Sequence, residues 1–127
     1  MLFCVNAHAS EDKWVVETIA YEASSEPFEG QVAVASVIKT RMKERNQTSK
    51  EVVLAKSQFS CWKDGKPTQK RKLTAKELYI ARKAWDEAKV GKANLYCTKA
   101  VADKTWWTKS PKVHFIKTIG NHNFYKE

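Results

Sequence analysis

The chain opens on a pattern of apolar residues at near-helical spacing. These residues are Trp14, Val15, Ile19 and Ala23. Ser10 is a suitable N-cap, and Pro27 ends the pattern because the residue before a proline avoids the α conformation. The spacing predicts a helix over residues 11–24.

A second apolar pattern has no polar face in its first half. Residues 34–38 carry only small or branched side chains, and the stretch becomes basic beyond Lys39. A helix that is apolar all round is usually buried. We therefore predict a central helix that begins at Glu29-Gly30 and reaches solvent near Arg45.

Two capping boxes mark the starts of further helices. Thr48-x-x-Glu51 precedes a short apolar run, and Thr74-x-x-Glu77 precedes apolar residues that share one face. Gly91 is a suitable C-cap for the second of these helices. The pattern thus predicts one short helix after Thr48 and a longer helix over residues 74–91.

The pattern changes to short β signals after residue 94. Residues 95–97 are a strand candidate, and Trp106-Trp107 lies in a predicted loop or turn. Residues 113–118 and 123–125 flank Gly120-Asn121, which predicts a hairpin. The fold class is α+β, mostly helical with a short late β-hairpin.

Length and composition predict one domain. The chain has 127 residues and no apolar run near the ~20 residues of a membrane helix. Residues 1–9 end in Ala7-His8-Ala9, which has the small-x-small form of a signal-peptidase site. They are either the remnant of a leader or an N-terminal extension that packs on a domain of residues 10–127. A remnant would place the mature chain, from Ser10, outside the cytoplasm.

The formal net charge is +9. A basic surface favours an anionic partner, which includes nucleic acid, lipid headgroups and acidic polymers. Residues 63–72 are polar and form a predicted exposed loop. The segment of residues 63–76 gathers basic side chains, namely Lys63, Lys66, Lys70, Arg71, Lys72 and Lys76. A solvated loop is the favoured interpretation, and an electrostatic anchor to an anionic envelope is the alternative.

The cysteines do not form a disulfide framework, because their number is odd. Cys61 and Cys97 could form one bridge if Cys4 belongs to a leader, but two buried thiols are favoured. No Cys or His spacing suggests a zinc site. We expect no metal and no other cofactor.

Three sequence blocks carry a resemblance to a known family. Residues 22–37 read E-A-x-x-E-x-x-x-G-x-x-A-V-A-x-V, residues 58–62 read Gln-Phe-Ser-Cys-Trp, and residues 118–124 contain Gly-Asn-His-x-Phe. Together they resemble the SleB-like cell-wall hydrolases, the family of spore-cortex-lytic enzymes. In that family an Asn-Arg pair follows the first block, whereas this chain has Thr40-Arg41 and keeps only the arginine.

The resemblance implies a small lysozyme-like domain that cleaves peptidoglycan glycan strands between MurNAc and GlcNAc. It favours lytic transglycosylation, which leaves 1,6-anhydro-MurNAc ends. Glu22 is the candidate general acid/base. A carboxylic acid held against apolar packing keeps its proton closer to neutral pH than one in water, as a general acid requires. Without the resemblance, a solvated helix glutamate would be the favoured interpretation of Glu22.

The other candidate site residues are less specific. Glu26 lies one helical turn after Glu22 and is either a second carboxylate or a residue that holds the turn at Pro27. One of the adjacent tryptophans is expected to be exposed. The predicted substrate-binding residues are Tyr21, Gln58, Ser60, Trp106, Thr118 and His122. Each could instead be structural: Gln58 and Ser60 in a turn, His122 in a hydrogen bond, and the aromatic residues in the core.

Three other functions remain as alternatives. A muramidase would hydrolyse the same bond, a wall-binding protein would not cleave it, and a nucleic-acid-binding module would use the positive charge. No nucleic-acid-binding motif is present, so we expect no nucleic acid. The expected partners are peptidoglycan glycan strands and anionic envelope polymers, bound by a monomer. The expected location is extracytoplasmic, or release at host lysis if a phage encodes the chain.

Overall fold

The computed structural model describes the backbone of residues 2–127 and the side chains of residues 12–127. The helices are α1 (Leu2–Ala23), α2 (Phe28–Arg45), α3 (Ser49–Leu54) and α4 (Ala75–Glu87), with 3-10 helices η1 (Lys99–Lys104) and η2 (Trp106–Lys109). The strands are β1 (Trp62–Lys63), β2 (Lys66–Pro67), β3 (Leu95–Thr98), β4 (His114–Ile119) and β5 (His122–Lys126). The predicted α+β class is confirmed.

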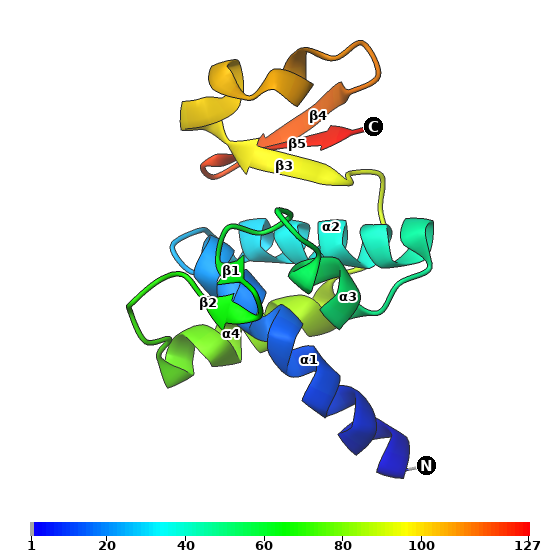
Figure 1. The fold of residues 1–127 in the computed structure, drawn as a ribbon, viewed down its shortest axis with the longest axis vertical. Helices are drawn as coiled ribbons and strands as arrows, with labels where there is room; N and C mark the ends of the chain where they lie inside the picture. Colours follow the sequence, from blue (N-terminus) through cyan, green and yellow to red (C-terminus); the bar gives the residue numbers. More distant parts are fainter. Residues whose placement is uncertain (1) are drawn as a thin grey trace.

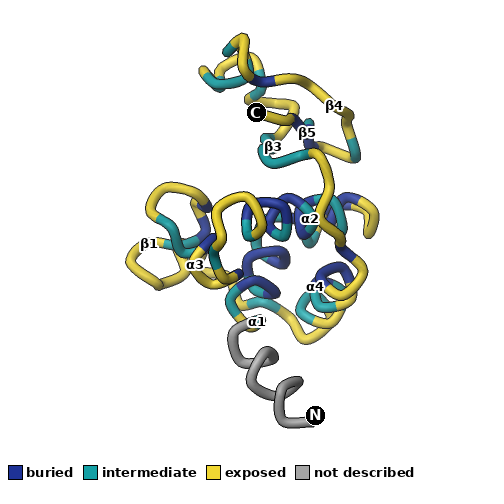
Figure 2. Tube along the Cα trace, turned by 90° about the vertical axis from the view of Figure 1, so that its right-hand side faces the viewer, coloured by how far each residue is buried: buried dark blue, intermediate teal, exposed yellow. Residues whose placement is uncertain are grey.

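Helix α2 is the centre of the fold. Figure 1 shows α1, α3 and α4 on one side of α2 and the sheet of β3, β5 and β4 on the other. Ala35 and Ile38 pack into the core shared with α1, α3 and α4, whereas Val34 and Val37 pack with Phe124 of the sheet. Figure 2 shows α2 as buried or intermediate along most of its length. A helix covered on two sides needs apolar residues on both faces, which confirms the central helix expected from the sequence.

The late β element is a three-stranded antiparallel sheet with the order β3-β5-β4. Strands β4 and β5 form the predicted hairpin, and Gly120 has a φ of +57° in the turn between them. Strand β3 pairs along the other edge of β5, with Thr98 opposite His122. This pairing places β3 and β5 side by side, and Tyr96 of β3 contacts Glu22 in the last turn of α1.

Two predicted helix boundaries are wrong. Helix α1 starts at Leu2, so Ser10 lies inside the helix and does not cap it. Helix α4 ends at Glu87, and Gly91 does not have the left-handed conformation of a C-cap. The chain leaves α4 early because it binds α2: Lys39 Nζ donates to the Ala88 carbonyl at 2.8 Å, and the Gly91 N–H donates to Thr40 Oγ1 at 2.9 Å.

The structure does not show whether residues 1–9 are the remnant of a leader. The side chains of these residues, including that of Cys4, lie outside the described part of the chain. The leader remnant therefore stays a prediction. None of the helices in the described part has the length and apolar character required to cross a membrane.

The predicted loop over residues 63–72 contains a small hairpin. Strands β1 and β2 pair antiparallel, and Asp64 and Gly65 in the turn both have positive φ values, 52° and 76°. This is the turn geometry that matches the twist of paired strands. The hairpin is exposed, as predicted (Figure 2). Both predicted capping boxes, at Thr48 and Thr74, are present.

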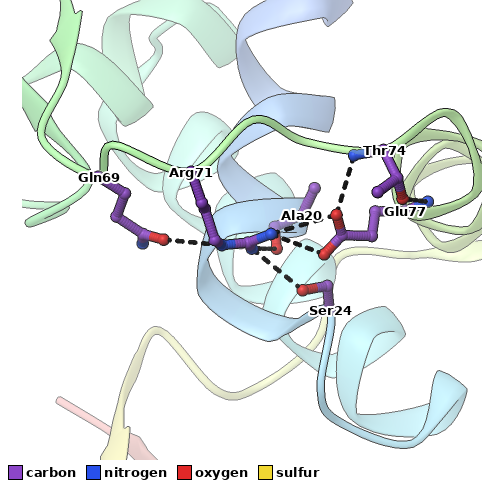
Figure 3. Close-up of polar contacts among 6 residues, drawn as sticks. All are labelled: Ala20, Ser24, Gln69, Arg71, Thr74 and Glu77. Atoms are coloured by element: carbon purple, nitrogen blue, oxygen red, sulfur yellow. Dashed lines mark hydrogen bonds and ion pairs between the residues drawn. The ribbon is translucent and has the colours of Figure 1, made fainter.

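Arg71 connects this hairpin segment to α1 and α4 (Figure 3). Its guanidinium donates to both carboxylate oxygens of Glu77, at 3.1 and 2.9 Å, and to the Ala20 carbonyl at 3.4 Å and Ser24 Oγ at 3.3 Å. The backbone N–H of Thr74, the Ser24 hydroxyl and Arg71 lower the pKa of Glu77 to about 2. A cation at the C-terminal end of a helix is favourable, so Arg71 secures the last turn of α1.

Candidate active site

A cleft of about 580 Å³ lies where the last turn of α1 meets β3 and β5. The segment after α3 forms another wall, and the remaining side chains come from α2 and from the segment that contains η1 and η2. The residues that line the cleft are Tyr21, Glu22, Arg41, Ser57, Gln58, Phe59, Ser60, Tyr96, Cys97, Thr98, Val101, Thr105, Trp107 and His122. The cleft thus brings together Tyr21, Glu22, Gln58, Ser60 and His122, which the sequence predicted separately.

Glu22 is half-buried in the last turn of α1 and lines the cleft. Its Oε1 accepts a hydrogen bond of 2.7 Å from the hydroxyl of Tyr96 on β3. Burial, and then the neighbouring Glu22 carboxyl, raise the pKa of Tyr96 well above its ordinary value. Tyr96 therefore keeps its proton and remains a hydrogen-bond donor to Glu22.

Glu26 does not line the cleft. Its carboxylate is buried, with 8% of the residue exposed, and accepts two hydrogen bonds from Asn121: the backbone N–H at 2.7 Å and Nδ2 at 3.1 Å. Burial raises the pKa of Glu26, but the bonds from Asn121, together with the attraction of His122 in its protonated form, outweigh it, and the net pKa is lowered. Glu26 holds the turn between β4 and β5 and is not a second carboxylate beside Glu22. Of the two interpretations left open by the sequence, the structure agrees with a structural role, although the turn that Glu26 holds is not the one at Pro27.

His122 follows this turn, is buried and lines the cleft. Its ring lies edge-on to Tyr96, with 5.1 Å between the centroids, and its Nδ1 lies 3.6 Å from Glu26 Oε1. Burial lowers the pKa of His122, although Glu26 and Glu22 oppose the shift. The imidazole is therefore predominantly neutral at neutral pH.

Gln58 and Ser60 enter the cleft because the residue between them is held in the core. Phe59 is buried, whereas its two neighbours are exposed. Ser57 has a φ of +62°, and Thr68 of the β1–β2 hairpin donates to the Ser60 carbonyl at 2.7 Å. Phe59 is part of the core that α1, α2, α3 and α4 share. The exposed side chains on either side of it line the cleft, where Gln58 Oε1 accepts one long bond of 3.5 Å from Arg45 Nη1.

Trp106 and Thr118 do not line the cleft. Trp106 is 81% exposed on η2, and Thr118 donates from its hydroxyl to Asn123 Oδ1 at 2.7 Å on the hairpin. Trp107 lines the cleft instead and packs edge-on against Tyr125 at 5.1 Å. The prediction that one of the two adjacent tryptophans is exposed is confirmed, but the exposed residue lies outside the cleft.

Tyr96 and Arg41 are cleft residues that the sequence did not single out for chemistry. Tyr96 belongs to a correctly predicted strand, but its contact with Glu22 joins residues 74 positions apart. Arg41 was visible as the arginine of the family pair, and no role followed from that pattern. Both residues reach the cleft only through the packing of β3 on α2.

The structure also shows how far the thiols are buried and how the potential metal ligands are arranged. Cys61 is a buried free thiol whose pKa burial raises to about 12, and Cys97 is a half-buried free thiol in the cleft. The favoured interpretation of buried thiols holds for Cys61 and in part for Cys97. Within the described side chains, no group of three or more His, Cys, Asp or Glu residues is arranged to hold a metal ion.

Comparison with known proteins identifies the family of this chain. The family model described as Cell Wall Hydrolase matches residues 25–125. The chain belongs to the cell wall hydrolase family. The matched residues begin just after Glu22, so the match covers most of the cleft but not this carboxyl group.

Two curated relatives of this cell wall hydrolase are spore cortex-lytic enzymes. The protein from Oceanobacillus iheyensis is 35% identical over 109 residues, which is 83% of this chain and 37% of the relative. The protein from Bacillus cereus is 32% identical over 126 residues, which is 95% of this chain and 46% of the relative. The chain therefore spans less than half the length of these relatives.

A solved structure has the same fold. The catalytic domain of the germination-specific lytic transglycosylase SleB from Bacillus anthracis matches with a TM-score of 0.70 and 27% identity. The match covers 91% of this chain and 93% of that domain. The predicted SleB-like family and α+β fold are thus confirmed.

Proposed function

We propose that this domain cleaves the glycan strands of peptidoglycan as a lytic transglycosylase, with Glu22 as its general acid and base. The observation that carries the proposal is that Glu22 is the sole carboxylic acid among the cleft-lining residues and accepts a 2.7 Å hydrogen bond from Tyr96. The relatives named as cortex-lytic enzymes and the structural match to a lytic transglycosylase domain support the same activity.

One carboxyl group is enough for this reaction. Protonated Glu22 gives its proton to the glycosidic oxygen between MurNAc and GlcNAc as the bond from MurNAc C1 to that oxygen breaks. The Glu22 carboxylate then takes the proton of the MurNAc C6 hydroxyl, and O6 bonds to C1 to close a 1,6-anhydro ring. The proton returns to Glu22 and no water is consumed.

Tyr96 contributes most when Glu22 is ionised. A hydrogen bond to a carboxylate is stronger than one to a neutral acid, so the Tyr96 hydroxyl stabilises the state after proton donation. The same bond fixes the rotamer of Glu22 at the end of α1. Gln58 and Ser60 are positioned to bind the hydroxyl and N-acetyl groups of the sugars.

The position of Glu26 favours transglycosylation over hydrolysis. A hydrolase that uses two carboxylates needs both of them beside the scissile bond. Glu26 is buried outside the cleft and is held by Asn121. A muramidase would have to activate water with another group, of which His122 is the candidate.

The proposal extends to the setting in which the enzyme works. The net charge of +9 suits an enzyme that acts on anionic envelope polymers. We propose an extracytoplasmic monomer, or a phage enzyme released at host lysis. Nucleic acid is not expected as a partner.

The test is a digest of purified peptidoglycan by the wild type, Glu22→Gln and the control Glu29→Gln. Glu29 is an exposed carboxylate on α2 outside the cleft, so the control makes the same chemical change away from the site. Mass spectrometry should find anhydro-muropeptides with the wild type and the control, and none with Glu22→Gln. Reducing-end products would instead indicate a muramidase. Equal products from Glu22→Gln would refute the role of Glu22.

A further inference from the structure

Arg41 presents an unusual charge in the wall of the cleft. It lies on the central helix α2, only 5% of the residue is exposed, and it lines the cleft together with Glu22 and Tyr96. Its Nε donates to the carbonyl of Asn94 at 2.8 Å, just before β3. This bond fixes the plane of the guanidinium relative to the cleft.

The rest of the guanidinium lies over the Phe59 ring, 5.5 Å from its centroid, but forms no ion pair within the described residues. Nη1 is buried and has no hydrogen-bond partner among residues 12–127. Glu22, which also lines the cleft, accepts its hydrogen bond from Tyr96 instead. A buried cation without a counter-charge is unfavourable, so a ligand that brings an anionic oxygen into the cleft would relieve this cost.

We propose that Arg41 binds the lactyl carboxylate of a muramic acid residue whose stem peptide has been removed. This inference rests on the proposed glycan cleavage, because the muramic acid that presents C1 to Glu22 carries its lactyl group at C3 of the same ring. Arginine binds carboxylates through charge-assisted hydrogen bonds and neutral carbonyls less strongly. A stem peptide converts this carboxylate into a neutral amide. Arg41 therefore makes the cleft prefer peptide-free strands to peptide-bearing ones.

The experiment compares two ligands that differ only in this group. Peptide-free glycan strands carry lactyl carboxylates, and coupling the same strands to methylamine converts the carboxylates into neutral amides. Binding is measured by calorimetry in a Glu22→Gln background, so that the strands are not cut. The proteins are Glu22→Gln alone and with Arg41→Gln, Arg41→Lys or Lys43→Gln. Lys43 is an exposed cation on the same helix, outside the cleft, and controls for net charge.

Arg41→Gln should weaken binding of the carboxylate strands at least tenfold, which is about 1.4 kcal/mol. It should weaken binding of the amidated strands less than threefold. Arg41→Lys should retain part of the preference, and Lys43→Gln should retain all of it. Equal losses for both ligands, or no loss for either, would overturn the proposal. The ratio of the two affinities separates recognition from a loss of structure at the Asn94 contact, since damage to the fold weakens both ligands alike.

The outcome is independent of the digest described above. In one outcome the wild type yields no glycan products in the digest, while Arg41→Gln abolishes the preference for carboxylate strands in the binding experiment. This outcome would refute the proposed function and leave Arg41 as an anion-binding residue. A wild type that yields anhydro products, with Arg41→Gln binding both ligands as the background does, would refute only the role of Arg41.

Discussion

Replacing Gly120 with alanine is expected to destabilise the turn that places His122 in the cleft. Gly120 has a φ of +57°, and a Cβ atom at this position would lie 2.5 Å from Glu26 Oε1 and 3.0 Å from Pro27 Cδ. A flexible carboxylate could usually move aside. Here it is buried and bonded to the backbone and side chain of Asn121, so moving it breaks those bonds.

The structure allows the size of this effect to be worked out. The left-handed conformation costs an L-residue about 1–2 kcal/mol. A hydrogen bond to a charged group contributes about 1.5–3 kcal/mol, and at least one of those made by Glu26 is lost. Gly120→Ala should therefore lower the free energy of unfolding by about 2.5–5 kcal/mol.

Gly65 provides the matched control. It has a φ of +76° in the β1–β2 turn, but apart from Gly65 itself and the residues on either side of it, no atom lies within 4 Å of the position its Cβ would take. Gly65→Ala should lower the free energy of unfolding by only about 1–2 kcal/mol, since only the backbone term applies. Urea unfolding followed by circular dichroism measures both variants. If Gly120→Ala costs no more than Gly65→Ala, the close packing of Glu26 against the turn does not stabilise the protein and the argument fails.

Three further predictions concern the cleft and its surroundings. Tyr96→Phe removes the 2.7 Å bond to Glu22 and should lower kcat on glycan strands about 10- to 100-fold without a matching loss of stability; an unchanged kcat would exclude a catalytic contribution of this bond. Glu26 has a lowered pKa in the folded state, so its stabilising effect is complete above the ordinary carboxyl pKa of 4.5 and is lost as the pH falls through the folded value. The stability difference between wild type and Glu26→Gln should thus shrink in urea titrations below pH 4.5, and a constant difference would contradict the lowered pKa. The Cys61 thiol, with its pKa raised to about 12, should resist iodoacetamide at pH 8 until urea unfolds the protein, and rapid native alkylation of its peptide by mass spectrometry would show that the site is open.

Local signals in the sequence account for the correctly predicted elements. The capping boxes at Thr48 and Thr74 satisfy N–H groups within a few residues of themselves, so their effect is visible in the sequence. The hairpin at Gly120 was predictable for the same reason, because the turn needs a residue that accepts positive φ. The end of α4 was not predictable, because it depends on bonds to Lys39 and Thr40 of another helix.

Glu26 illustrates the limit for the site. Its spacing from Glu22 would place both carboxylates on one helix face only if the helix continued, but α1 ends at Ala23. The chain then turns, and Glu26 reaches Asn121, which is 95 positions away in the sequence. No local pattern encodes such a contact.

The sequence by itself determined the helices, the hairpin, the family blocks and the position of Glu22, because periodicity, capping and turn residues act over a few neighbours. Only the tertiary structure decided which side chains share the cleft with Glu22. Tyr96 and Arg41 line the cleft, and Glu26 does not, because β3 and the β4–β5 turn pack across α2 and the end of α1. These contacts join distant parts of the chain, and burial and hydrogen bonding, rather than spacing in the sequence, select them.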